Sequence, residues 1–159
     1  MAKQNSVIID PGHGGSDPGA IYGNRREKDD TLALAYDIGN ALEQRGIRVE
    51  YTRIGDIYNS PYEKAEIGNR SAADLFLSIH RNAMPVPGTG SGTMSLIFGR
   101  GGDAETFAKN INKELAKTGW KDLGISERPN LVVLRDTALP AVLVEVGFID
   151  NENDNDFFD

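Results

Sequence analysis

Two histidines and one glutamate, side chains that can bind metals or transfer protons, stand at or near the ends of apolar segments. The chain has only two histidines, His13 and His80, and each follows a short apolar run. Glu145 lies near the end of a third apolar run, at residues 141–148. Functional sites in open α/β sheets form beyond the carboxyl ends of the strands. These three side chains are therefore predicted to share one site.

Such a site could hold a catalytic zinc ion, which takes three nitrogen or oxygen ligands and keeps one position open for water. The two histidines would supply two ligands. The spacing does not choose the third ligand among four acidic residues: Asp10, Asp17, Glu27 and Asp74. Taken alone, a histidine after a strand is more often a structural hydrogen-bonding residue than a metal ligand.

Glu145 also has two interpretations. A carboxylate inside an apolar run is costly to bury unless it is paired or acts on a metal or a proton. The structural alternative to a catalytic role is a buried ion pair with Arg135 or Arg70.

The elements around these residues predict an α/β fold in a single domain. Short apolar or alternating runs predict strands at residues 7–9, 47–51, 75–79, 93–98, 131–134 and 141–146. Helical spacing predicts helices at residues 30–46, 60–73 and 104–115. The segment 118–130 is expected to be irregular.

Composition excludes several classes of function. The 159 residues carry a formal net charge of −7 and no cysteine, so disulfide scaffolds, cysteine-bound zinc and cysteine nucleophiles are excluded. An acidic chain without a basic stripe argues against binding to nucleic acid or to an anionic membrane. No apolar segment has the length of a signal-peptide core or a membrane span.

Other catalytic motifs are absent or weak. The chain has neither the Gly-Lys-Ser/Thr of a P-loop nor a serine nucleophile elbow. Residues 99–104 match a loose dinucleotide-binding pattern, but no strand with an acidic end follows at the right distance. An ordinary turn between a strand and a helix explains this segment better.

Four blocks of the sequence together resemble the zinc-dependent N-acetylmuramoyl-L-alanine amidases of the amidase 3 type. The blocks are residues 7–15, 27–29, 73–83 and 140–149, and they occur in the family's order. The resemblance implies a six-stranded, mostly parallel sheet flanked by helices. It also implies that His13, Glu27 and His80 bind one zinc ion and that Glu145 is the catalytic glutamate.

The implied reaction is hydrolysis of the amide bond between N-acetylmuramic acid and L-alanine in peptidoglycan. Asn82 and Arg135 are predicted to contact the substrate. Their structural alternatives are a loop or helix cap for Asn82 and an ion pair for Arg135. Arg81 departs from the family pattern, in which a small residue often follows the second histidine, so the charge of the groove is expected to differ.

Residues 1–159 are expected to form one amidase catalytic domain, without a wall-binding module and without the final helix that members of this family usually have. Because no signal peptide is found, the domain resembles an endolysin or a sporulation lysin more than a secreted autolysin, and an excised domain is the alternative. It is expected to be a monomer that acts at the bacterial cell wall and stays in the cytoplasm until lysis. Peptidoglycan would be its partner. The alternatives are a zinc peptidase that cuts within the stem peptide and a non-catalytic wall-binding module.

Overall fold

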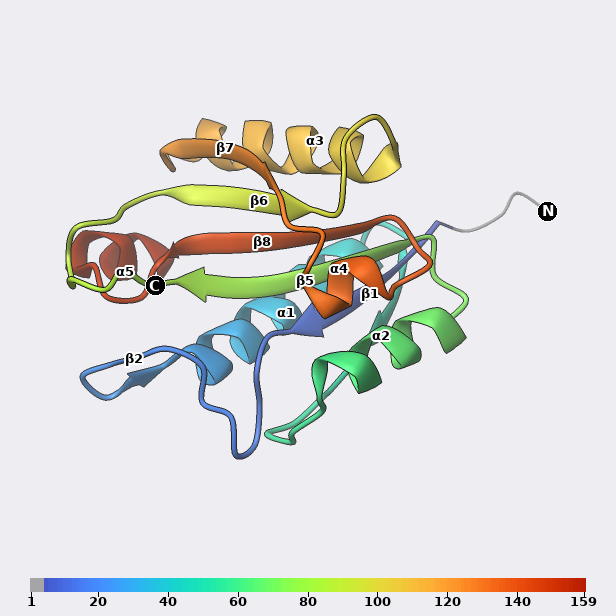
Figure 1. Cartoon of the computed structure of the whole chain (residues 1–159), viewed down its shortest axis with the longest axis horizontal. Helices are drawn as coiled ribbons and strands as arrows, with labels where there is room; N and C mark the ends of the chain where they lie inside the picture. Colours follow the sequence, from blue (N-terminus) through green and yellow to red (C-terminus); the bar gives the residue numbers. More distant parts are fainter. Residues whose placement is uncertain (1–4) are drawn as a thin grey trace.

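A six-stranded sheet forms the centre of the molecule (Figure 1). The computed structural model describes residues 5–159, so the first four residues before the first strand lie outside the described part. The strands are β1 (Ser6–Pro11), β4 (Arg48–Tyr51), β5 (Leu75–Asn82), β6 (Thr93–Ile97), β7 (Asp122–Glu127) and β8 (Ala141–Phe148). Their order across the sheet is β4-β1-β5-β8-β6-β7.

Four neighbouring strands, β4, β1, β5 and β8, run parallel to one another. β6 runs antiparallel to β8 and parallel to β7. The predicted α/β class with a mostly parallel sheet is therefore confirmed. Parallel strands are covered on both faces, which explains why β1 is buried throughout and why every residue of β8 except Glu145 is buried.

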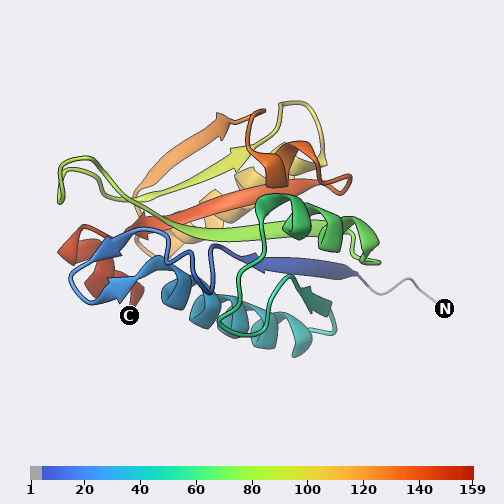
Figure 2. The ribbon, with the colours of Figure 1, turned by 60° about the horizontal axis from the view of Figure 1, so that its bottom comes forward.

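Helices cover both faces of the sheet. They are α1 (Glu27–Glu43), α2 (Pro61–Arg70), α3 (Asp103–Lys117), the short α4 (Val132–Arg135) and α5 (Glu152–Phe158). One core cluster joins the sheet to α1 and α3, and a second joins the opposite face to α2 and α4. Figure 2 shows α1 and α2 on opposite sides of β1. A small hairpin of β2 (Ile21–Tyr22) and β3 (Arg25–Arg26) precedes α1.

The structure corrects two sequence predictions in the C-terminal third of the chain. Residues 131–134 were predicted to form a strand, but residues 132–135 form α4. The segment 118–130 was predicted to be irregular, but it contains β7, which pairs with β6 at the edge of the sheet. The structure also adds α5, which the sequence patterns did not predict.

A cavity of about 550 Å³ lies between α1, α3 and α5. Its lining is mostly apolar and includes Leu77, Trp120 and Val144. It contains neither histidine nor Glu145, so it does not coincide with the predicted site. Among residues 5–159, none of the helices is both long and apolar enough to cross a membrane.

Candidate metal and active site

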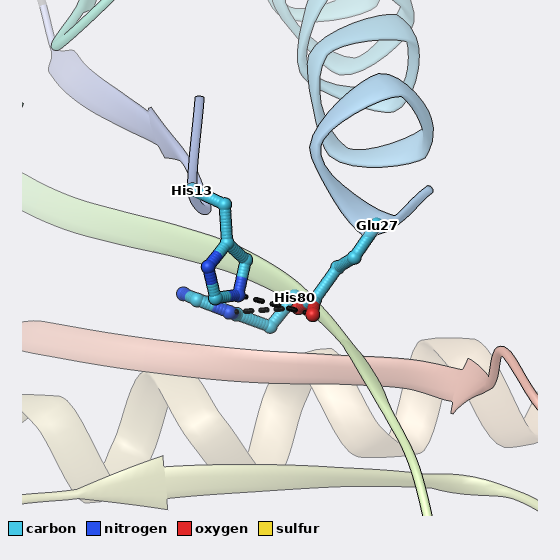
Figure 3. Close-up of side chains that lie close together, drawn as sticks. All are labelled: His13, Glu27 and His80. Atoms are coloured by element: carbon cyan, nitrogen blue, oxygen red, sulfur yellow. Dashed lines mark hydrogen bonds and ion pairs between the residues drawn. The ribbon is translucent and has the colours of Figure 1, made fainter. Parts of the chain in front are cut away.

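Side chains from three separate segments converge beyond the carboxyl end of β1 and beside β5 (Figure 3). His13 follows β1, Glu27 is the first residue of α1, and His80 lies in β5. Their nitrogen and oxygen donor atoms all lie within 4.8 Å of one another. His13 Nε2 is 3.0 Å from Glu27 Oε2, and His80 Nδ1 is 2.9 Å from Glu27 Oε1. Two imidazole nitrogens and one carboxylate form a donor set that fits zinc, so this is a possible metal site.

Two glycines allow this close approach. A Cβ on Gly12 would lie 2.5 Å from His80 Cε1, and a Cβ on Gly19 would lie 2.5 Å from His13 Cδ2. His13 itself has a φ of 62°, in the left-handed region that residues other than glycine rarely adopt. The backbone of the turn after β1 therefore places the His13 imidazole in the site. Because its conformation at His13 is unfavourable, contacts from the surrounding residues must stabilise it.

The environment of Glu27 keeps this carboxylate ionised. Burial by itself raises the pKa of Glu27, but hydrogen bonds and charge attraction from His13 and His80 outweigh it, so the pKa lies well below its usual range. The main-chain N–H groups of Ala20 and Arg81 also donate to this carboxylate, at 2.9 and 3.0 Å. An ionised carboxylate is the form that binds a metal.

Asp17 holds the far side of the His13 ring. Its Oδ2 is 2.8 Å from His13 Nδ1, which leaves Nε2 facing the site. A carboxylate on the outer nitrogen is the arrangement that orients metal-binding histidines in proteins. Burial lowers the pKa of His13, but hydrogen bonds and charge attraction from Glu27 and Asp17 outweigh this effect and raise it.

Two other acidic candidates for the third ligand bond to other groups and are not part of the His13, Glu27 and His80 cluster. Asp10 is fully buried and bonds to the hydroxyls of Thr52 and Ser78, at 2.6 and 2.7 Å. Asp74 accepts from the main-chain N–H and the hydroxyl of Ser6, at 3.0 and 2.9 Å, at the start of β1. The geometry therefore leaves Glu27 as the carboxylate between the two histidines.

Glu145 stands beside His80 on the neighbouring strand. The two residues are partners in the register of β5 and β8. The Oε2 atom of Glu145 is buried and has no hydrogen-bond partner among residues 5–159. Burial raises the pKa of this carboxyl group and outweighs the charge attraction of His80, which lowers it; the negative charge of Glu27 makes a smaller raising contribution.

The structural alternative for Glu145 is not found. Arg70 pairs with Glu66 on α2, and Arg135 pairs with Asp136 at 2.7 Å. Neither arginine forms an ion pair with Glu145 in the described part of the chain. A buried carboxyl oxygen without a partner, next to a possible metal site, is suited to accept a proton.

A cavity of about 270 Å³ opens beside the two histidines. Its walls come from the start of α2, from α4 and from the segment that leads into α4. The lining combines apolar side chains with amide and charged groups: Asn59, Pro61, Lys64, Asn130, Leu131, Val132, Val133 and Leu143. This cavity is smaller than the apolar one between α1 and α3, but His13 and His80 line it, whereas Glu27 and Glu145 do not.

Lys64 lines this cavity and contacts the chain just before the first histidine. Its ammonium group is buried, lies 3.0 Å from Asp10 Oδ1, and donates to the Pro11 carbonyl at 2.8 Å. Pro11 is the last residue of β1, so this contact fixes the start of the turn that carries His13. The sequence analysis did not identify Lys64, because its partners are distant in sequence.

The two predicted substrate contacts are less closely tied to the site. Asn82 ends β5, and its side-chain oxygen accepts from the main-chain N–H of Ala83 at 2.9 Å. Arg135 is exposed at the end of α4. Neither residue lines the cavity of about 270 Å³, so their contact with substrate stays a prediction.

Comparison with known proteins identifies the family of this chain. The family model for N-acetylmuramoyl-L-alanine amidase matches residues 7–159. The N-acetylmuramoyl-L-alanine amidase CwlM of Bacillus licheniformis is 40% identical over 152 residues, which cover 93% of this chain and 58% of that protein. An endolysin of Bacillus phage SPP1 is 36% identical over 154 residues, covering 93% of this chain and 56% of that protein.

A solved structure agrees with this match. The N-acetylmuramoyl-L-alanine amidase from Clostridium difficile 630 superposes with a TM-score of 0.90 and 34% sequence identity, covering 96% of this chain and 84% of that chain. The present chain thus spans less than two thirds of the two curated relatives and most of the solved one. By sequence and by fold, the chain belongs to the N-acetylmuramoyl-L-alanine amidase family.

Proposed function

We propose that this chain hydrolyses the amide bond between N-acetylmuramic acid and L-alanine in peptidoglycan, with zinc held by His13, Glu27 and His80. The observation that carries the proposal is the convergence of these three donor groups beside the unpartnered carboxyl oxygen of Glu145. Family membership supplies the class of bond. When bound, a zinc ion would lower the pKa of water and polarise the carbonyl group of the substrate.

Glu145 would act as the base and then as the acid. Its carboxylate would take the proton of the attacking water and pass it to the nitrogen of the leaving L-alanine as the C–N bond breaks. The pKa of Glu145 is raised, which brings it closer to neutral pH. A group with such a pKa is suited both to accept a proton and to release it. The products are the free lactyl carboxylate of the glycan and a peptide that begins with L-alanine.

The other side chains would prepare the site. Glu27 stays ionised and keeps both imidazoles directed inward. Asp17 holds the outer nitrogen of His13, which fixes the position of the ring. All four candidate residues come from one chain, so we expect the domain to act as a monomer.

The cavity beside the histidines would hold the parts of the substrate on either side of the scissile bond. Its apolar wall suits the methyl groups of the lactyl and L-alanine units, and its asparagines suit the peptide amides. We expect Asn82 and Arg135 to contact more distant parts of the substrate, with the exposed Arg135 pairing with a stem-peptide carboxylate. Since two relatives are named as an amidase and an endolysin, we expect the cell wall to be the place of action.

The proposal is tested by digesting purified peptidoglycan with and without a zinc chelator and labelling the new amino termini. We expect N-terminal L-alanine to appear with zinc and to be lost with the chelator or in a His80→Ala variant. New termini from another residue would favour a zinc peptidase that cuts within the stem. Zinc-independent binding to the wall without any new termini would favour a binding module and contradict the proposal.

A further inference from the structure

Arg53 is a buried arginine with an unusual set of partners. Only 2% of the residue is exposed, although burying a cation away from water is costly. Its guanidinium group donates to four main-chain oxygens, those of Pro11 (3.1 Å), Gly12 (3.0 Å), Lys28 (2.9 Å) and Gly55 (3.0 Å). Carbonyl dipoles, rather than a directly bound carboxylate, therefore satisfy its N–H groups.

Three of these oxygens belong to the two segments that carry candidate metal ligands. Pro11 and Gly12 immediately precede His13, and Lys28 immediately follows Glu27. One nitrogen, Nη2, donates both to the Gly12 carbonyl and to the Lys28 carbonyl. The planar guanidinium thus bridges the turn after β1 and the first turn of α1 across a gap of 15 positions in the sequence.

Thr31 strengthens the same bridge from α1. Its hydroxyl is fully buried and lies 2.8 Å from the Gly12 carbonyl and 3.2 Å from the Lys28 carbonyl. It is also 3.3 Å from Nη2 of Arg53. Two side chains, those of Arg53 and Thr31, thus hold the carbonyl of the residue directly before His13, whose own backbone has the unfavourable φ of 62°.

We propose that Arg53 is a positioning residue for the metal site: it fixes the separation of the His13 and Glu27 segments so that both side chains reach the same ion. The inference rests on the proposed metal site and adds a residue that does not itself touch the ion. The planar guanidinium group of arginine has several N–H donors in fixed directions, which suits this task, whereas the ammonium group of lysine is a single charged group at the end of a flexible side chain. The geometry of the guanidinium group, rather than its charge, would fix the separation of the two segments.

The decisive variant is Arg53→Lys, because it keeps the positive charge and removes the fork. We expect its affinity for zinc, measured by competition with a chromogenic chelator, to fall about 10- to 100-fold, as for residues that orient metal ligands. We also expect the visible spectrum of the cobalt-substituted protein to change, since this spectrum reports ligand geometry. The control is Arg45→Lys, at an exposed arginine whose guanidinium group donates to the Ala41 carbonyl near the end of α1, and it should match the parent.

A second variant guards against loss of the fold. If Arg53→Lys does not give a folded protein by circular dichroism, Thr31→Val removes one bridging hydroxyl with little change in volume. We expect it to weaken zinc binding about three- to tenfold. Zinc affinity within twofold of the parent and an unchanged cobalt spectrum in the folded variant would overturn the inference while leaving the proposed function intact. A parent that binds no zinc would overturn both.

Discussion

Glu27 and Glu145 are carboxylates at the same site with opposite tendencies to hold a proton. Burial raises the pKa of both, but two imidazoles beside Glu27 reverse the effect there. At Glu145 burial remains the largest effect: the charges of His80 and His13 lower its pKa and the charge of Glu27 raises it, but the net shift is upward. Groups whose environments separate their pKa values commonly divide acid–base and charged roles between them. This pair therefore suits one metal ligand and one proton carrier.

Replacing Glu145 by glutamine tests this division. We expect Glu145→Gln to bind zinc as the parent does and to lose at least about 100-fold in kcat, because the proton acceptor is gone. The measurements are the rate of release of N-terminal L-alanine and zinc affinity by chelator competition. Glu114→Gln, at an exposed glutamate on α3, is the control. A Glu145→Gln protein with more than a tenth of the parent rate would contradict the role.

Gly12 permits a second test, of the close approach between the turn and His80. A Cβ at this position would lie 2.5 Å from His80 Cε1, closer than real contacts allow, so Gly12→Ala must displace the imidazole. We expect zinc affinity to fall about tenfold or more. Gly99→Ala is the matched control, because a Cβ there meets nothing within 4 Å. Equal zinc affinity in the two variants would show that the turn after β1 can move without weakening zinc binding.

At the scale of elements, the start of α2 is important because this helix carries Lys64 under the His13 turn. Ser60 caps the helix: its hydroxyl accepts from the Glu63 N–H, and the Glu63 carboxylate accepts from the Ser60 N–H. Pro61 at the first helical position adds a backbone already set for a helix. Ser and Glu at this spacing are the sequence pattern of a capping box, and both of its hydrogen bonds are present in the structure.

Loss of the cap has an expected cost. We expect Ser60→Ala to lower the free energy of unfolding by about 1 kcal/mol, because an N–H at the helix start loses its acceptor. Urea denaturation measures the change, with exposed Ser16→Ala as a control that should leave stability within about 0.5 kcal/mol. A loss as large in the control as in Ser60→Ala would show that the capping box contributes nothing special.

The C-terminal helix α5 is held by the side chain of Arg81, which lies in β5. Arg81, whose side chain is fully buried, pairs with Asp30 on α1 at 2.6 Å and donates to Asn155 on α5 at 2.7 Å. Its guanidinium lies 4.0 Å from the centre of the Phe158 ring. Arg81 therefore joins α5 to the start of α1, and it does not line the cavity beside the histidines, where the sequence analysis expected an effect on charge.

At the scale of the whole molecule, the candidate metal site joins three segments that are far apart in the sequence. A ligand that binds only the folded chain stabilises it by about 4 kcal/mol at 1,000 times its dissociation constant. We therefore expect excess zinc to raise the Tm by about 10 °C over the chelated protein. Differential scanning calorimetry measures the shift, and His80→Ala should abolish it. A parent Tm that does not respond to zinc would argue against a bound ion.

The buried strands were predictable because their signal is local. Runs such as 7–9, 75–79 and 141–146 are apolar because both faces of a parallel sheet are covered, and each was placed correctly within β1, β5 and β8. The order of strands and helices then predicted that His13, His80 and Glu145 would approach one another, since parallel strands end at the same edge of the sheet.

The errors fall where the local signal is weak. Residues 131–134 form a short apolar run, whose periodicity cannot separate a strand from a helical turn. β7 contains Gly124 and acidic residues at both ends, so only pairing with β6 makes it a strand. The acidic α5 is similarly held by its contacts with Arg81 and by the cap from Asn151.

By itself, the sequence determined the fold class, the histidines at the strand ends and, through family resemblance, the expected ligands. Spacing could not choose Glu27 over Asp10, Asp17 or Asp74, because the distance between residues 13, 27 and 80 depends on how α1 packs against β1 and β5. The family resemblance implied Glu27, and in the tertiary structure its carboxylate lies between the two histidines. Only the tertiary structure shows the contacts of Lys64 and Arg53. Their partners are main-chain carbonyls and buried groups distant in sequence, and no pattern of side-chain types records such contacts.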